Sequence, residues 1–186
     1  SILSWKEEGV ELIQQSRIPE SEQVDLTLNL KKKQKLILRI RKPDWTDKAT
    51  FIINGEEEQP LLGSDGYWII DRVWERKNVI TLRLPMHIYT ENLTGTDRYV
   101  ALLYGPYVLA GRMGKENLPT TFWGKMNNTA MNKMDMAKVP VFREPVERIP
   151  THVEVVSGEP LKFGINLKGF EHIVLEPFYK VRSEEH

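Results

Sequence analysis

The chain has 186 residues, enough to bury one large core or two small ones. Lys and Arg together number 26, as do Asp and Glu, so the formal net charge is zero and the basic excess of a nucleic-acid binder is absent. Hydrophobic residues make up 40% and charged residues 28%, a balance typical of globular proteins.

Several classes of protein and site are disfavoured at once. No apolar run reaches roughly 18 residues, so we expect no membrane span. No cysteine is present, which excludes disulfides, thiolate metal sites and cysteine nucleophiles. The four histidines are scattered without ligand spacing, so we predict neither a metal nor a cofactor. The sequence starts at Ser1 without Met, which we interpret as a fragment, a processed form or a cloning scar.

The first half reads as strands. Apolar residues alternate with polar ones over 24–30, over 36–41 and over 80–84, the period of a strand with one face buried. Ile37 interrupts the polar face of the second run, so we expect that strand to be covered on both faces. Pro43 and Pro85 each remove a backbone donor and should end a strand. Asn54-Gly55 predicts a tight hairpin, because both residues tolerate a positive φ.

The second half is less regular. Residues 99–110 are apolar and interrupted by Gly105-Pro106, which predicts two strands around a turn, with a buried helix end as the alternative. Residues 111–145 hold five of the six methionines and little alternation, typical of a linker or a long loop. Alternation returns over 153–155 and 161–167.

Short strands at close spacing predict an all-β fold, an antiparallel β-sandwich made of one or two jelly-roll or immunoglobulin-like sandwiches. We expect a β-sandwich domain over 1–110. Residues 111–186 would form a long loop followed by a smaller β region, which either stands alone or completes the same sandwich.

Six segments in order resemble the region that follows the catalytic barrel in glycoside hydrolase family 127, the β-L-arabinofuranosidase-like enzymes. The first resembles an Arg-Ile-Pro-x-Trp strand end of that family. The segments are Leu38–Trp45, Ile53–Gly55, Gly66–Trp74, Ile80–Met86, Val100–Pro106 and Pro177–Tyr179. The sequence departs from the family at Lys77-Asn78, where Gly-Asp is usual, and after Tyr179.

The resemblance implies that activity lies outside this chain. In the family it resides in an N-terminal all-helical toroid with a cysteine nucleophile and a zinc ion held by cysteines and a glutamate. No cysteine is present here, so no catalytic residue can be carried over. What remains resembles a non-catalytic accessory β-sandwich region of a bacterial glycoside hydrolase. A periplasmic or extracellular parent protein is favoured.

Exposed aromatic rings can stack on sugars, so four residues are candidates for carbohydrate binding: Tyr67, Trp68, Trp74 and Trp123. Tyr67 and Trp68 are neighbours in a strand, so one should point inward and the other outward. The competing interpretation is that the tryptophans fill the core. Asp71 and Glu75 are the carboxylates that a small hydrolase would use, but solvated strand faces explain them better.

Two functions follow from the sequence. The first is the function of an accessory region, which supports an N-terminal catalytic domain or the formation of a homo-oligomer. It predicts an exposed apolar face where that domain docks. The second is a carbohydrate-binding module for plant-type polysaccharide. We expect no nucleic-acid partner.

Overall fold

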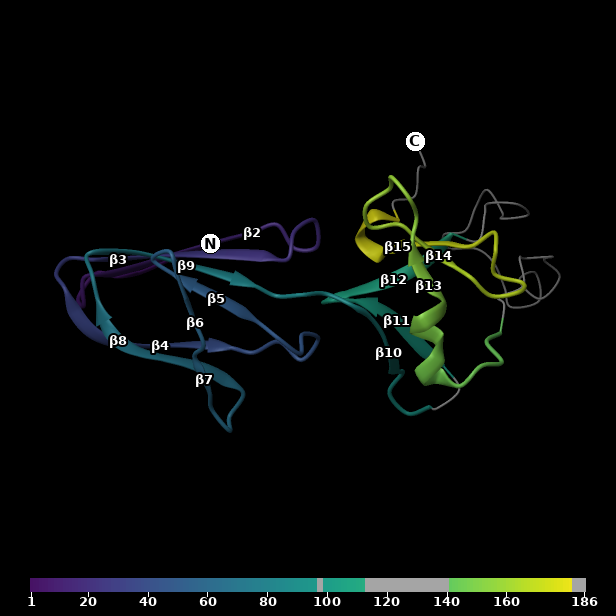
Figure 1. Cartoon of the computed structure of the whole chain (residues 1–186), viewed down its shortest axis with the longest axis horizontal. Helices are drawn as coiled ribbons and strands as arrows, with labels where there is room; N and C mark the ends of the chain where they lie inside the picture. The colour runs from purple at the N-terminus through teal and green to yellow at the C-terminus, as the bar shows by residue number, and fades with distance from the viewer. Residues whose placement is uncertain (97–98, 113–140, 182–186) are drawn as a thin grey trace, which may run out of the picture. The chain divides into compact units, whose positions relative to one another are not determined.

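The computed structural model describes residues 1–96, 99–112 and 141–181 (Figure 1). Nearly all of its regular structure is strand, with two 3₁₀ segments, η1 (Val146–His152) and η2 (Phe178–Lys180). The pairings between these strands are antiparallel. The chain is therefore an all-β protein, as the alternating pattern predicted. Contacts divide it into two units, which are described separately: Ser1–His87 with Tyr104–Pro106, and Ile88–Leu103 with Tyr107–His186.

The first unit contains a large and a small sheet. The large sheet has six strands. Their order is β1 (Ile2–Trp5), β2 (Val10–Ser16), β3 (Gln23–Leu30), β9 (Lys77–Arg83), β5 (Thr50–Ile53) and β6 (Glu56–Glu58). The small sheet has three strands, in the order β4 (Gln34–Arg41), β8 (Tyr67–Trp74) and β7 (Leu61–Leu62). The small sheet therefore has half as many strands as the sheet it faces.

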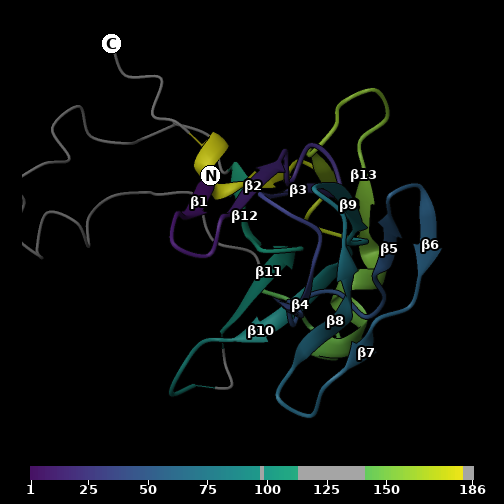
Figure 2. The same cartoon turned by 90° about the vertical axis from the view of Figure 1, so that its left-hand side faces the viewer.

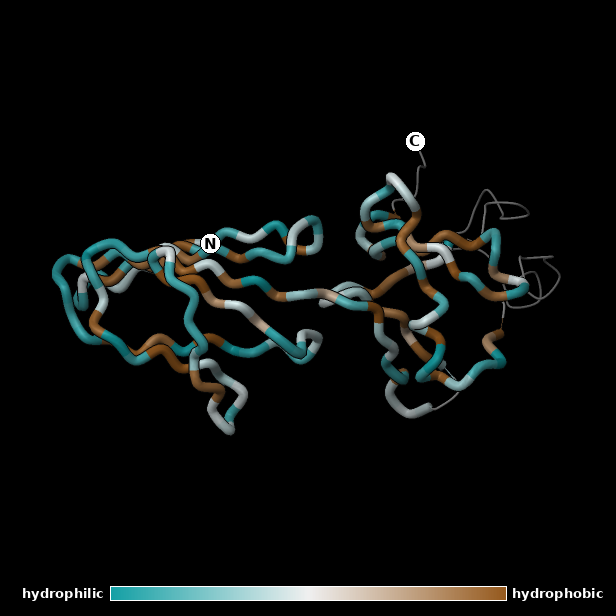
Figure 3. Tube along the Cα trace, in the orientation of Figure 1, coloured by the Kyte–Doolittle hydropathy of each residue, from teal (hydrophilic) through white to brown (hydrophobic). Residues whose placement is uncertain are grey.

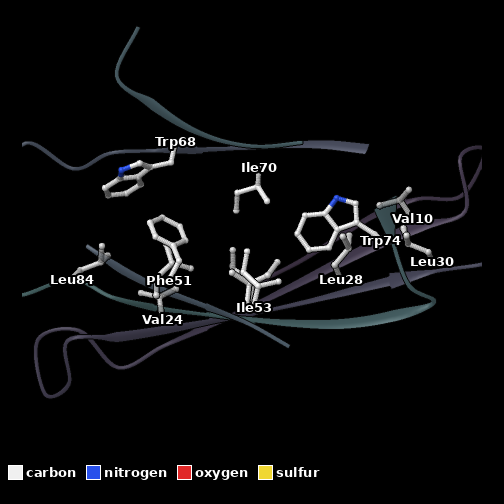
Figure 4. Packing of buried hydrophobic residues seen from close by; sticks show 13 residues of the cluster. Val10, Val24, Leu28, Leu30, Phe51, Ile53, Trp68, Ile70, Trp74 and Leu84 are labelled. Atoms are coloured by element: carbon white, nitrogen blue, oxygen red, sulfur yellow. The ribbon is translucent and has the colours of Figure 1, made fainter. Parts of the chain in front are cut away.

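The core of this unit lies between the two sheets. Figure 4 shows Trp68, Ile70 and Trp74 of β8 facing Phe51 and Ile53 of β5, together with Leu28 of β3. Every second residue of β3 is buried, from Val24 to Leu30, as the two-residue period requires. Burying this much apolar surface is the main favourable term in folding the unit.

Local signals in the sequence specify the turns correctly. Asn54 and Gly55 have φ values of 54° and 92°, and they join β5 to β6 in the predicted hairpin. The lysines of residues 31–33 form the hydrophilic turn between β3 and β4 (Figure 3). The register of β4 against β8 pairs Ile40 with Trp68 and Leu36 with Arg72.

The second unit is built on one sheet of six strands. Their order is β10 (Ile88–Asn92), β11 (Val100–Tyr104), β12 (Tyr107–Arg112), β15 (Val174–Pro177), β14 (Phe163–Ile165) and β13 (Val153–Val155). As predicted, residues 99–110 form two strands around Gly105-Pro106 rather than a helix. The buried side chains include Leu109, Phe163 and Leu175, and Phe142 stacks on Phe170 with ring centroids 4.4 Å apart.

The main division between the two units falls between His87 and Ile88. It lies inside residues 1–110, which we expected from the sequence to form the first domain. The reason is long-range pairing: β12 pairs with β15, so residues 107–112 join the C-terminal strands. Alternation within a strand reports which face is buried but not which distant strand lies beside it. The methionine-rich stretch falls almost entirely outside the described residues.

Candidate functional site

The outer face of the small sheet carries the one sequence-predicted aromatic residue that is exposed among the described residues. Tyr67 begins β8 with 37% of its surface exposed. The Arg39 guanidinium lies over its ring, 5.2 Å from the centroid, and pairs with the Asp65 carboxylate. Asp65 Oδ1 also accepts the backbone N–H of Tyr67 at 3.3 Å. The arrangement places a partly exposed ring, a cation and an anion side by side.

The two neighbouring tryptophans point the other way. Trp68 is 6% exposed and packs edge-to-face on Phe51, with ring centroids 5.0 Å apart and planes at 75°. Trp74 is fully buried, and its indole N–H donates to the Leu36 carbonyl oxygen at 3.0 Å. The Arg72 guanidinium also lies over the Trp74 ring, 5.4 Å from its centroid. Neither ring offers a face to a sugar, because both side chains are buried. The expectation that one of Tyr67 and Trp68 points inward is confirmed. Trp123 lies outside the described residues.

An exposed tryptophan that the sequence reasoning missed lies in β1. Trp5 is 56% exposed, and its register partner in β2 is Val10, a core residue. Cross-strand partners share one face of a sheet, so the Trp5 ring is on the core side of the large sheet. The alternation of Leu3 and Trp5 with Ser4 was the available signal, but four residues are too few to distinguish a strand from a loop.

A groove with a volume of about 380 Å³ opens beside Trp5. Its lining is almost wholly apolar and comes from both sheets. The lining residues are Trp5, Glu8, Val10, Leu12, Leu28, Leu36, Ile37, Leu38 and Trp74. In Figure 2, which looks along this unit, β1 and β2 extend to the side beyond β4. The groove therefore lies where the small sheet ends and leaves the large sheet uncovered. We call it the apolar groove.

Ile37 bears directly on this site. The interruption of the polar face led us to expect a strand covered on both sides, yet Ile37 is 59% exposed. That expectation is wrong for the described residues. Its side chain points to the outer face of β4, which leaves most of its surface exposed.

A second hollow is polar, with a volume of about 690 Å³. It lies where β2 ends and β3 begins. Its lining residues are Ser1, Gln14, Gln15, Ser16, Arg17, Ser21, Gln23 and Asp25. Asp25 accepts hydrogen bonds from the Gln23 side chain at 3.0 Å and from the Thr81 hydroxyl at 2.7 Å. None of these lining residues is aromatic, so the hollow offers a sugar no stacking surface.

The carboxylates considered for hydrolysis are engaged in surface ion pairs. Asp71 Oδ1 lies 3.2 Å from Lys35 Nζ, and Glu75 pairs with Lys33. Among the described residues, no group of three or more Asp, Glu and His side chains could hold a metal ion. No helix in the described part of the chain is long and apolar enough to cross a membrane.

Two groups have shifted pKa values, Glu171 in the second unit and Tyr104 in the first. The pKa of the Glu171 carboxyl is lowered by hydrogen bonds from its own backbone N–H and from that of Gly169. The pKa of the Tyr104 hydroxyl is raised by burial and by the nearby Glu22 carboxylate. Both shifts are caused by burial or by groups close to the residue itself, so they reflect local structure.

Two protein families match the chain, one over most of each unit. Residues 1–86 match the family described as "Beta-L-arabinofuranosidase, GH127 middle domain". Residues 89–185 match DUF4986, described as a domain of unknown function. The chain belongs to the DUF4986 family, and its residues 1–86 are similar to a GH127 middle domain. The resemblance to glycoside hydrolase family 127 is thereby confirmed, and the chain covers a non-catalytic part of such a protein.

Solved structures give similar matches. One is a GH127 β-L-arabinofuranosidase from Geobacillus stearothermophilus T6, with 30% identity over 54% of this chain and a TM-score of 0.48. A protein described as a glycoside hydrolase has 25% identity over 58% of this chain, with a TM-score of 0.49. The GH127 β-arabinofuranosidase BT3674 has 19% identity over 59%, with a TM-score of 0.46.

This chain covers between 16% and 20% of the length of these three structures. A comparison with curated proteins finds no match.

Proposed function

We propose that this chain is an accessory scaffold of a glycoside hydrolase, which supports the catalytic domain without contributing catalytic groups. The observation that carries the proposal is the apolar groove beside Trp5. A GH127 middle domain belongs to a larger hydrolase, and the groove gives it an apolar surface on which another domain can pack.

The energetics favour burial of this surface by a partner. Trp5, Leu3 and Ile37 are each at least 46% exposed although they flank a packed core. Fully burying one large apolar side chain contributes roughly 1.5–3 kcal/mol. Three such side chains would supply a substantial part of the association free energy of a domain interface, before the entropic cost of docking.

Co-expression tests the proposal. The 186-residue chain would be produced together with a GH127 catalytic domain that lacks its own middle domain. We expect the two to co-purify, and the catalytic domain to show a higher soluble yield and a higher Tm than alone. Trp5→Asp should abolish both effects, because it places a charge in the groove. Tyr99→Asp, a change at a similarly exposed ring in the other unit, is the matched control.

The scaffold proposal fails if the catalytic domain has the same yield and Tm with and without this chain. It also fails if Trp5→Asp and Tyr99→Asp behave alike. A fold check by circular dichroism on both variants separates loss of binding from loss of structure.

A second candidate is carbohydrate binding at the outer face of the small sheet. The observation that favours it is the exposed Tyr67 ring beside the Arg39–Asp65 pair, which together offer stacking, donors and acceptors. Arg39 already occupies one ring face, so only the other is open to a sugar. Plant-type polysaccharide is the proposed ligand class.

Calorimetry with arabinan, arabinogalactan and pectic oligosaccharides tests this candidate. Saturable heat that disappears in Tyr67→Ala and persists in Trp5→Ala would support it. An absence of heat with all three ligands would remove it.

A further inference from the structure

The starting point is the unequal width of the two sheets in the first unit. Six strands face three, and β4 forms one edge of the small sheet. Among the described residues, β8 is the one strand paired with β4. On the large sheet, Leu3 and Leu12 are register partners, as are Trp5 and Val10, and all four share the core side. Leu3 and Trp5 are exposed because, in the part of the chain that the structure describes, no strand of the small sheet lies opposite them.

The register shows which backbone groups of β4 are free. Lys42 N–H donates to the Gly66 carbonyl at 2.9 Å, in continuation of the β4–β8 register. Both backbone groups of a residue point to the same side in an antiparallel pair, and the side alternates along the strand. Even-numbered residues of β4 therefore bond to β8. Lys35, Ile37, Arg39 and Arg41 direct their N–H and C=O groups to the open edge.

A free edge with an apolar flank is a template for one more strand. Neighbouring strands lie roughly 4.8 Å apart, and a strand added to β4 would lie over the uncovered part of β1 and β2. Its inward side chains would fill the apolar groove beside Leu36, Leu38 and Trp5. Its outward side chains would lie beside Ile37, which the described chain leaves exposed. The inward-facing residues, at every second position of the added strand, must therefore be apolar.

The charges on the outer face of β4 determine which residues suit the outward-facing positions of the added strand. The outer face of β4 presents Lys35, Arg39 and Arg41 on the same side as Ile37. Their present partners are Asp71, Asp65 and Asp44, and all of these groups are substantially exposed. A second copy of β4 would place cations opposite cations, which destabilises a strand pair. A strand with carboxylates at these positions would instead complement them.

We propose that the β4 edge receives an extended segment of alternating apolar and acidic residues, which adds a fourth strand to the small sheet. The segment comes from the polypeptide of the catalytic domain, a source that rests on the function proposed above. The backbone of Lys35, Ile37, Arg39 and Arg41 supplies the hydrogen bonds, and the apolar groove receives the inward side chains. The cations on β4 select the charge of the partner and disfavour edge-to-edge self-association.

A peptide experiment tests the chemistry of the edge. The probe is an octapeptide of alternating Glu and Val, acetylated and amidated, since β4 is eight residues long. Two controls are an alternating Lys-Val octapeptide and a Val₄Glu₄ block of identical composition. Titration into the full chain should show saturable binding of the Glu-Val peptide, at least tenfold tighter than either control.

Variants of β4 separate the backbone from the side chains. Ile37→Pro removes one edge N–H and should weaken peptide binding at least tenfold. Ile37→Thr keeps that N–H and should weaken it less. Arg41→Glu should lower the affinity for the Glu-Val peptide and raise it for the Lys-Val peptide. Arg41 is the safest charge to reverse, because it is highly exposed and lies 3.7 Å from its partner Asp44.

The outcomes are distinguishable. Equal binding of the three peptides, or Ile37→Pro binding as tightly as the native chain, overturns the strand proposal even if the catalytic domain still co-purifies. Failure of co-purification alone overturns the scaffold function and the assigned source, while the peptide data still decide the chemistry of the edge. A far-ultraviolet spectrum of each variant confirms that the sheets are intact.

Discussion

Asn78 shows how one buried polar residue can hold a sandwich together. It is 1% exposed, and every side-chain polar atom is used. Its amide nitrogen donates to the carbonyl oxygens of Glu75 at 2.7 Å and Leu28 at 3.3 Å. Its amide oxygen accepts from the Glu75 N–H and the Asn54 side chain. The residue thus ties β3, the start of β9 and the Asn54-Gly55 hairpin to one point.

Replacing Asn78 with Ala should be strongly destabilising. The change removes the side-chain partner of the buried Leu28 carbonyl and of the part-buried N–H and C=O of Glu75, and an unsatisfied buried group costs about 1–3 kcal/mol. We expect the free energy of unfolding of the first unit to fall by about 3 kcal/mol. Urea denaturation followed by tryptophan fluorescence measures this. Asn29→Ala, which removes a more exposed side-chain bond to Glu11, is the control and should cost about 1 kcal/mol or less.

At the scale of the element, the effect of proline in β4 should depend on whether the residue replaced has an odd or an even number, because odd-numbered N–H groups face the open edge and even-numbered ones bond to β8. Ile37→Pro removes an N–H that faces the open edge, where proline is accepted. Leu38→Pro removes a ladder hydrogen bond to Ile70 and should cost about 3 kcal/mol or more. Thermal melts of the two variants check the pair. Equal destabilisation would show that the alternation of free and bonded groups has been assigned incorrectly.

The second unit depends on a buried carboxylate. Glu176 of β15 is 3% exposed and pairs with Arg112 of β12, whose side chain is about half exposed. Arg112→Met should destabilise this unit by about 2 kcal/mol, because it leaves a buried charge without its partner. Glu176→Gln in the same background should recover most of the loss. Chemical denaturation of the single and double variants measures the coupling between the two residues.

Sequence reasoning succeeded where the signal is local. The Asn54-Gly55 hairpin, the alternation in β3, the break at Gly105-Pro106 and the opposite orientations of Tyr67 and Trp68 each depend on a few adjacent residues. It failed where long-range pairing decides. The exposure of Trp5 follows from the width of the small sheet, and that of Ile37 follows from its place on the outer face of β4, and no local pattern encodes either. Trp74 ends β8 in the core, where its indole N–H donates to the Leu36 carbonyl oxygen.

At the scale of the whole molecule, charge balance and exposed apolar surface act together. The formal net charge is zero at pH 7, so little electrostatic repulsion opposes association of the chain. We expect light scattering of concentrated solutions to peak near pH 7 and to fall on either side. Trp5→Lys should lower that maximum by adding charge at the groove, and Tyr99→Lys is the control for added charge alone. Scattering that is independent of pH would contradict this prediction.

The alternation of β4 has a consequence for dynamics that can be seen one amide at a time. Each bonded N–H, as in Leu36, Leu38 and Ile40, is shielded by β8, while its neighbours are open to water. Hydrogen exchange along this strand should therefore follow a sawtooth, with slow and fast amides in strict succession. A strand that docks on the edge would slow the fast amides and flatten the sawtooth. Protection along these eight residues would thus record whether the sheet is complete.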